Sequence, residues 1–178
     1  MKPWQTLSRQ MILDHSKYLK IEQHRIDTGT HGVIDDWPWV IAPDYVNVVA
    51  VTAEGRFICF RQTKYAIEGT SIAPVGGYVE PGDSVRETAE RELREETGYM
   101  ADDWTFLGSF PVDSSRGVGA AHFFLARNAT FVGEVDSDDL EPQEFLLLTR
   151  DEIETAIDAG DVKTLPWVSV FALALRKC

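Results

Sequence analysis

Hydrophobic residues alternate with polar residues over short runs through much of the chain. This alternation has the period of a half-buried β-strand, and turn residues such as Glu54-Gly55 separate neighbouring runs. The runs predict strands over residues 46–52, 56–61, 105–112, 120–127 and 144–148. The glycine-rich residues 74–77 predict a loop that leads past Pro81-Gly82 into a helix.

The helix that follows this loop has well-defined ends. Ser84 followed by Glu87 matches a capping box, in which each side chain accepts a hydrogen bond from the other residue's backbone N–H. Gly98 suits the residue that ends a helix, because glycine readily takes a left-handed conformation. The sequence therefore predicts a helix over residues 85–97.

Two further helices are predicted in the C-terminal part of the chain. Thr149 followed by Glu152 is a second capping box, and the helix that it begins ends at Gly160. Pro166 suits the first turn of a last helix through Arg176, because a proline there leaves no helical hydrogen bond unmade. Strands followed by helices that alternate with strands predict an α+β fold, with helices packed on a mixed sheet.

Residues 1–43 predict a small strand-rich segment in front of the main domain, which we assign to residues 44–178. Short alternating pieces such as residues 18–22 predict strands, and turn residues follow at 27–29. The segment Trp37-Pro38-Trp39 predicts exposed tryptophan side chains close to the boundary.

The charge of the chain restricts its partners. Lys and Arg total 17 against 29 Asp and Glu, which gives a formal net charge of -12. Such a surface repels phosphate backbones and anionic lipids, so we expect neither nucleic acid nor a membrane as a partner. Cys59 and Cys178 are too distant in sequence for a disulfide framework or a metal-ligand pair. Residues 1–10 lack the apolar run of a signal peptide, and residues 167–175 reach about half a membrane span, so we expect a cytoplasmic location.

The helix predicted at residues 85–97 carries charges where apolar side chains are usual. With about 100° between successive residues, every fourth residue from Val85 marks the packed face. Glu92 and Glu96 fall inside this apolar stripe, and Glu95 falls at its edge. Carboxylates that face the protein are costly unless something neutralises them.

Two interpretations of these carboxylates are open. In the first, the helix is solvated and pairs its Glu and Arg side chains four residues apart. In the second, a bound cation neutralises Glu92 and Glu96, because no Lys or Arg shares their sector of the helix. Clustered carboxylate oxygens of this kind suit Mg²⁺ or Mn²⁺.

The same residues resemble the Nudix box, whose pattern is Gly-x5-Glu-x7-Arg-Glu-aliphatic-x-Glu-Glu-x-Gly-aliphatic. The matching positions are Gly77, Arg91, Glu92, Leu93, Glu95, Glu96 and Gly98. The chain departs from the pattern at Asp83, which stands in place of the first Glu, and at Tyr99, which stands in place of an aliphatic residue.

This resemblance implies a fold and a chemistry. The fold is an αβα sandwich around a mixed sheet, and the reaction is hydrolysis of a nucleoside diphosphate linked to another group, with Mg²⁺ or Mn²⁺ as the cofactor. The implied metal ligands are the carbonyl of Gly76 and the carboxylates of Glu92, Glu95 and Glu96. Arg91 and Asp83 would orient these carboxylates. Water would attack a phosphorus with a glutamate as general base, and Glu92 and Glu96 are the catalytic candidates on the helix.

Other features are similar to the ADP-ribose and nucleotide-sugar pyrophosphatase branch of the family. They are Arg61-Gln62 at the end of a strand, the strand-rich N-terminal segment and the ending Glu-Glu-Thr-Gly-Tyr. This branch is commonly a homodimer with exchanged N-terminal domains, and it often takes its base from a later loop. Glu141 and Glu144 are the candidates for that base, and we favour Glu144, although a solvated acidic loop explains both residues equally well.

Substrate contacts outside the box are predicted from arginine and tryptophan side chains. Arg61 and Arg116 are candidates to bind phosphate, although an ordinary hairpin loop also explains the segment around Arg116. Trp37 and Trp39, with Trp4, are candidates to stack on a nucleobase. A packed edge or a dimer contact explains these tryptophans at least as well.

The leading hypothesis is therefore Mg²⁺-dependent hydrolysis of ADP-ribose or another nucleotide sugar to a nucleoside monophosphate and a sugar phosphate. The alternative enzymes are a nucleoside triphosphate hydrolase and a dinucleoside polyphosphate hydrolase. Two alternatives without catalysis are a nucleotide-binding regulator on the same scaffold and a structural domain without metal.

Overall fold

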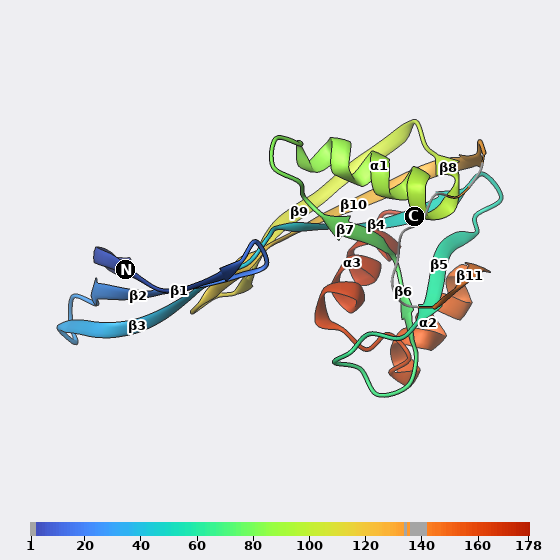
Figure 1. Ribbon diagram of the computed structural model, residues 1–178. Coiled ribbons are helices and arrows are strands. Elements are labelled where there is room, and N and C mark those ends of the chain that lie inside the picture. The colour runs from blue at the N-terminus through green and yellow to red at the C-terminus, as the bar shows by residue number, and fades with distance from the viewer. Residues whose placement is uncertain (1–2, 134, 136–141) are drawn as a thin grey trace. The chain divides into compact units, whose positions relative to one another are not determined.

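A computed structural model describes residues 3–133, 135 and 142–178 of the protein (Figure 1). The chain divides into two compact units. One unit contains residues 1–44 and 110–120, and the other contains residues 45–109 and 121–178. The domain boundary predicted between residues 43 and 44 stays a prediction.

The first unit contains an antiparallel sheet of N-terminal strands. These strands are β1 (Gln5–Ser16), β2 (Leu19–Asp27) and β3 (Val33–Ile41), paired in that order. Val40 of β3 also pairs in parallel with Gly117, the first residue of β10 (Gly117–Phe131). The prediction of a strand-rich N-terminal segment is confirmed.

The second unit contains a mixed sheet around β4 (Tyr45–Thr52). β4 pairs in parallel with β10, and antiparallel with β5 (Phe57–Gln62) and β7 (Val75–Tyr78). β5 pairs antiparallel with β6 (Ser71–Ala73) and β11 (Gln143–Leu148). β8 (Tyr99–Met100) and β9 (Asp103–Asp113) pair with β10.

The helices begin and end where local sequence signals place them. They are α1 (Val85–Thr97), α2 (Arg150–Ala159) and α3 (Leu165–Leu175). Both predicted capping boxes form, and the helices that they begin end at glycines in the left-handed conformation, with φ of 70° and 77°. Across the described residues, every helix is too short or too polar to cross a membrane.

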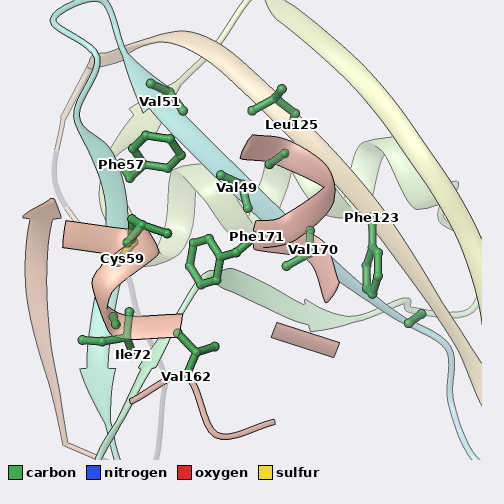
Figure 2. Packing of buried hydrophobic residues seen from close by; sticks show 14 residues of the cluster. Val49, Val51, Phe57, Cys59, Ile72, Phe123, Leu125, Val162, Val170 and Phe171 are labelled. Carbon is green, nitrogen blue, oxygen red and sulfur yellow. The ribbon is translucent and has the colours of Figure 1, made fainter. Parts of the chain in front are cut away.

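Two hydrophobic clusters lie on opposite faces of the sheet in the second unit. Phe57 and Cys59 of β5 belong to one cluster with Phe171 of α3, and Figure 2 shows these three side chains. Ile153 of α2 belongs to the same cluster. Ile58 and Phe60, which alternate with Phe57 and Cys59, belong to the other cluster, together with Ala89 and Leu93 of α1. Because neighbouring residues of a strand point to opposite faces, α1 covers one face and α2 and α3 cover the other. The predicted αβα arrangement is confirmed.

The glycine-rich segment differs from its prediction. Residues 75–78 form strand β7 rather than a loop, because they pair with residues 45–48, the first half of β4. Gly76 lies opposite Asn47, and Gly77 lies opposite Val46. Glycine is rare in strands, so its presence at both positions points to a close approach by other atoms.

Candidate functional site

The two glycines of β7 leave room for side chains that come close to the backbone. A Cβ atom at Gly77 would overlap the carboxylate of Glu92, which reaches across from α1. A Cβ atom at Gly76 would overlap the side-chain amide of Asn47 and the carbonyl of Val46. The acidic face of α1 therefore lies directly against β7, at the residues that begin the predicted box.

The carboxylates of α1 face the protein as the helical projection predicts. Only 13% of the Glu92 side chain is exposed. Glu96 accepts a hydrogen bond from the backbone N–H of Gly76, with 3.2 Å between N and Oε2. Both carboxylates thus lie beside the two glycines, whereas the side chain of Glu95 is 45% exposed.

Arg91 holds the carboxylates of Glu92 and Glu95. Its Nη1 lies 2.9 Å from Oε1 of Glu92 and 3.1 Å from Oε2 of Glu95. Arg91 starts from a different sector of the helix, but its long side chain reaches Glu92, so a cation is not required to neutralise this carboxylate. Burial lowers the pKa of Arg91, but Glu92, Glu95 and Glu80 outweigh it and raise the pKa, so this guanidinium stays charged.

Asp83 approaches the same guanidinium without reaching hydrogen-bond distance. Its Oδ2 lies 3.9 Å from Nε of Arg91. Within the described residues, the buried Nε and Nη2 atoms of Arg91 have no hydrogen-bond partner. Glutamate is the residue of the box pattern at this position, and its extra methylene would bring a carboxylate closer to Nε.

The residues fit a divalent cation by the type of their donor atoms. Carboxylate and carbonyl oxygens are the ligands that Mg²⁺ prefers, and the absence of a side chain at Gly77 makes space for one of them. In the conformation described, Arg91 holds Glu92 and Glu95, and the Gly76 N–H binds Glu96. Over residues 3–133, 135 and 142–178, no three His, Cys, Asp or Glu side chains are close enough together to hold a metal ion. A cation would therefore have to draw these carboxylates together.

Arg61 and Glu144 form a separate pair on the other face of the same sheet. They lie opposite each other on β5 and β11, with 2.6 Å between Nη1 and Oε2. Arg61 alternates with Phe60, which faces α1, so its side chain and that of Glu144 point to the face covered by α2. The structure does not bring Glu144 to the carboxylates of α1. The other candidate base, Glu141, lies outside the described residues.

A cavity of about 440 Å³ lies beside this pair, between β6 and α2. Its walls include Arg61, the buried Ser71 and the side of α2 that carries Asp151 and Thr155. The hydroxyl of Ser71 already accepts a hydrogen bond from the backbone of Lys163. The Ser71 hydroxyl in this cavity wall therefore helps to hold the sheet against the segment after α2.

The candidate tryptophans gather in the first unit. Trp4, Trp37 and Trp39 line a cavity of about 330 Å³. The rings of Trp4 and Trp37 are nearly perpendicular with centroids 5.4 Å apart, and buried His24 stacks on Trp39 at the same separation. These rings are therefore held by packing, and they leave a concave aromatic surface.

Arg116 also belongs to the first unit, in the turn between β9 and β10. Its side chain is exposed, and its backbone N–H donates to Oδ1 of Asp113 at 2.8 Å. Hydrogen bonds from the backbone of Ser115 and Arg116 lower the pKa of Asp113. These contacts are those of an ordered turn, in which the Arg116 side chain is available to a ligand.

The sequence patterns did not predict Asn47 as a residue of the site. It lies behind Gly76 and is 5% exposed, and its Oδ1 has no hydrogen-bond partner within the described part of the chain. The one signal in the sequence is its position, because it interrupts a run of valines in β4. The buried side-chain amide of Asn47 packs closely against the backbone of Gly76.

Comparison with known proteins finds similarity in both fold and sequence. A solved structure described as an ADP compounds hydrolase superposes with a TM-score of 0.82, over 99% of this chain and 94% of that one, at 20% identity. An ADP-ribose pyrophosphatase of Bacillus subtilis (strain 168) is 33% identical over 115 residues, which are 65% of this chain and 61% of the relative. A methanol dehydrogenase activator of Bacillus methanolicus is 29% identical over 116 residues, which are 65% of this chain and 60% of that protein. The match thus spans about three fifths of the length of both relatives.

The family comparison agrees with the residues described above. The NUDIX domain matches residues 42–170, a range that contains α1, β7 and the whole predicted box. The fold match and the arrangement of α1 against β7 agree with this assignment. The chain belongs to the NUDIX domain family.

Proposed function

We propose that the protein hydrolyses the diphosphate bond of a nucleoside diphosphate linked to another group, with ADP-ribose or another nucleotide sugar as the substrate class. The products would be a nucleoside monophosphate and a sugar phosphate. The observation that carries the proposal is the pair of carboxylates, Glu92 and Glu96, that α1 places against Gly76 and Gly77. The similarity to an ADP-ribose pyrophosphatase supports the choice of substrate.

Within this proposal, α1 binds the cofactor. Glu92, Glu95 and Glu96, with the carbonyl of Gly76, would hold Mg²⁺, or Mn²⁺ in its place, and NUDIX hydrolases generally use such divalent ions. A bound divalent ion lowers the pKa of water and neutralises phosphate charge. Arg91 keeps the carboxylates of Glu92 and Glu95 in position through its ion pairs.

Proton transfer requires a glutamate near the attacked phosphorus. Water attacks the phosphorus opposite the departing phosphate, and a carboxylate accepts the proton. Glu92 and Glu96 are the candidates on α1, and Glu141 and Glu144 are the candidates beyond it. The ion pair of Glu144 with Arg61 on the opposite sheet face favours the other three.

The rest of the substrate would be bound by the predicted aromatic and basic residues. Trp37 and Trp39 stay candidates to stack on the nucleobase, and Arg116 stays a candidate to bind phosphate oxygens. The ion pair of Arg61 with Glu144, on the sheet face opposite α1, argues against Arg61 as a ligand of phosphates beside those carboxylates. We also propose a homodimer in the cytoplasm. The exposed apolar side chains of β1, such as Leu7 and Met11, support a contact between two copies, which light scattering of the purified protein would detect.

A substrate panel tests the proposal. Purified protein with ADP-ribose and Mg²⁺ should release AMP and ribose 5-phosphate, and a chelator should stop the release. Other nucleotide sugars, nucleoside triphosphates and dinucleoside polyphosphates belong in the same panel, because they separate the alternative hydrolases. The proposal fails if no nucleoside diphosphate derivative in the panel is hydrolysed.

A second candidate function is a nucleotide-binding regulator without catalysis. The observation that favours it is the similarity to a protein named as an activator of methanol dehydrogenase. Calorimetry distinguishes the two functions, since a regulator should bind ADP-ribose with Mg²⁺ and leave it intact over hours.

A further inference from the structure

A row of aromatic side chains lies beside the C-terminal end of α1. Tyr99 of β8 stacks on Phe145 of β11, with ring centroids 6.0 Å apart and planes at 15°. Tyr99 also meets Phe131 of β10 edge-on at 5.5 Å, and Phe145 meets Phe60 of β5 at 6.1 Å. One tyrosine ring thus contacts aromatic side chains of two strands, β10 and β11.

This tyrosine is closely connected to the acidic helix. α1 ends at Gly98, whose N–H donates to the carbonyl of Arg94 at 2.8 Å, and Tyr99 is the next residue. The carbonyl of Gly98 accepts a hydrogen bond from Val132 at 2.8 Å. A Cβ atom at Gly98 would overlap the ring of Phe131. The last turn of α1, which carries Glu95 and Glu96, is therefore held against the end of β10.

The stacking on Phe145 ties the same turn to the edge of the sheet. β11 pairs with β5, and Phe145 remains 41% exposed even with Tyr99 against it. The box pattern has an aliphatic residue where this chain has Tyr99, and an aliphatic side chain cannot stack on a ring. Parallel stacking of two rings fixes their orientation as well as their distance.

We propose that Tyr99 is a positioning residue for the cation-binding carboxylates of α1. Its ring joins β10 and β11 to the last turn of the helix and thereby sets the carboxylate of Glu96 opposite the N–H of Gly76. Ligands of a metal or a substrate must be held to within about 0.5 Å of their productive geometry by the packing around them. This inference rests on the proposed function, because it assigns Tyr99 a role in binding the cation that the reaction needs.

The test compares three variants. Tyr99→Leu restores the aliphatic residue and removes the stacking, and Tyr99→Phe keeps the ring. Phe106→Leu is the matched control, because Phe106 of β9 is also an exposed aromatic residue, but its ring packs on that of Phe124, with centroids 5.2 Å apart, rather than on Phe145 or Phe131. Calorimetry measures the Mg²⁺ concentration that half-saturates binding for each variant, and hydrogen exchange of residues 94–98 is measured without metal.

We expect Tyr99→Leu to raise the half-saturating Mg²⁺ concentration about 5- to 10-fold, a change of the order of 1 kcal/mol in binding. It should also speed hydrogen exchange in the last turn of α1. Tyr99→Phe and Phe106→Leu should stay within twofold of the unsubstituted protein in both measurements.

Two results would overturn the proposal. One is a Tyr99→Leu protein with lower melting temperature but an unchanged Mg²⁺ concentration at half-saturation, since the ring would then serve stability alone. The other is an equal loss of Mg²⁺ affinity in Phe106→Leu. If the unsubstituted protein binds Mg²⁺ but hydrolyses none of the substrate panel, the proposed function fails while the effect of Tyr99 on the carboxylates can still be measured.

Discussion

Helices α1 and α2 are built by the same local rules and lie on opposite faces of one sheet. Each begins with a capping box, Ser84 with Glu87 in α1 and Thr149 with Glu152 in α2. Each ends at a glycine in the left-handed conformation, and each is acidic and amphipathic. Nothing in these end signals distinguishes a helix with a functional face from one that only packs.

The difference lies in where each helix puts its acidic side chains. In α2, Glu154 is 47% exposed and pairs with Arg150 one turn earlier, while apolar residues such as Ile153 face the sheet. In α1, Glu92 shares the inward face with Leu93 and meets a strand that has glycine where other strands carry side chains. The neighbouring backbone, rather than the helix alone, makes α1 a candidate site.

The largest expected effect comes from removing the charge of one glutamate in α1, compared with removing the charge of one glutamate in α2. Glu96→Gln should lower kcat for ADP-ribose by about 10²–10⁴-fold, the range for loss of a group that acts in proton transfer or holds its partners. Glu154→Gln on α2 is the matched control, and its kcat should stay within twofold because Glu154 is exposed. Steady-state rates at saturating Mg²⁺ measure both, and similar losses in the two variants would contradict the contrast.

The next effect tests the contact between α1 and β7. Gly77→Ala should weaken Mg²⁺ binding and destabilise the protein by about 0.5–1.5 kcal/mol, because its Cβ overlaps the carboxylate of Glu92 and forces this flexible side chain into another conformation. Gly133→Ala is the control, since a Cβ there meets no atom of the described residues within 4 Å. Urea unfolding measures both free energies. A stable Gly77→Ala protein with unchanged Mg²⁺ affinity would show that the close approach is not needed.

Much of this contrast could be predicted from the sequence, because it depends on residues close together in the chain. Capping boxes and terminal glycines are local signals, so the ends of both helices agree with the pattern. The inward placement of Glu92 and Glu96 follows from the helical period. The fold class follows from the order of strands and helices.

Features that depend on distant pairing could not be predicted in the same way. Residues 75–78 form a strand only because β4 pairs with them. The direction of the Glu144 side chain depends on its register with Arg61, which is set by two strands far apart in sequence. Arg91 reaches Glu92 through rotation of a long side chain, and a helical projection fixes only the directions of Cβ atoms.

A smaller effect tests the similarity of the two helices rather than their difference. Ser84→Ala and Thr149→Ala should each lower the free energy of unfolding by about 1 kcal/mol, as loss of an N-cap does elsewhere. Hydrogen bonds from the side chain and backbone of Ser84 lower the pKa of Glu87, and those from the backbone and side chain of Thr149 lower that of Glu152.

The two caps should also share one pH dependence. A carboxyl whose pKa is lower in the folded state than its ordinary 4.5 stabilises the protein fully above that value. This stabilisation is lost as the pH falls through the lowered pKa. The difference in stability between each variant and the unsubstituted protein should therefore shrink below pH 4.5 in both helices, which urea unfolding at several pH values checks. A difference that shrinks for one cap alone would show that the two are not equivalent.

The smallest effect is a gain, and it belongs to α1 alone. Asp83→Glu should raise stability by about 0.5 kcal/mol, because a longer carboxylate can close the 3.9 Å gap to Nε of Arg91 and form a hydrogen bond. The expected value is at the low end of the range since the Asp83 side chain is 37% exposed. The melting temperature should rise by about 1–2 °C.

Asp151→Glu in the first turn of α2 is the matched control for this gain. Asp151 is exposed, and the same added methylene there should leave the melting temperature unchanged. A rise in both variants would indicate a general effect of glutamate near a helix start. A rise in Asp83→Glu alone, accompanied by a lower half-saturating Mg²⁺ concentration, would mean that a better-held Arg91 also holds Glu92 and Glu95 in a geometry closer to that of the bound cation. A fall in melting temperature for Asp83→Glu would instead mean that the shorter aspartate is fitted to this turn and that the unpartnered Nε of Arg91 is not a defect that a longer acid repairs.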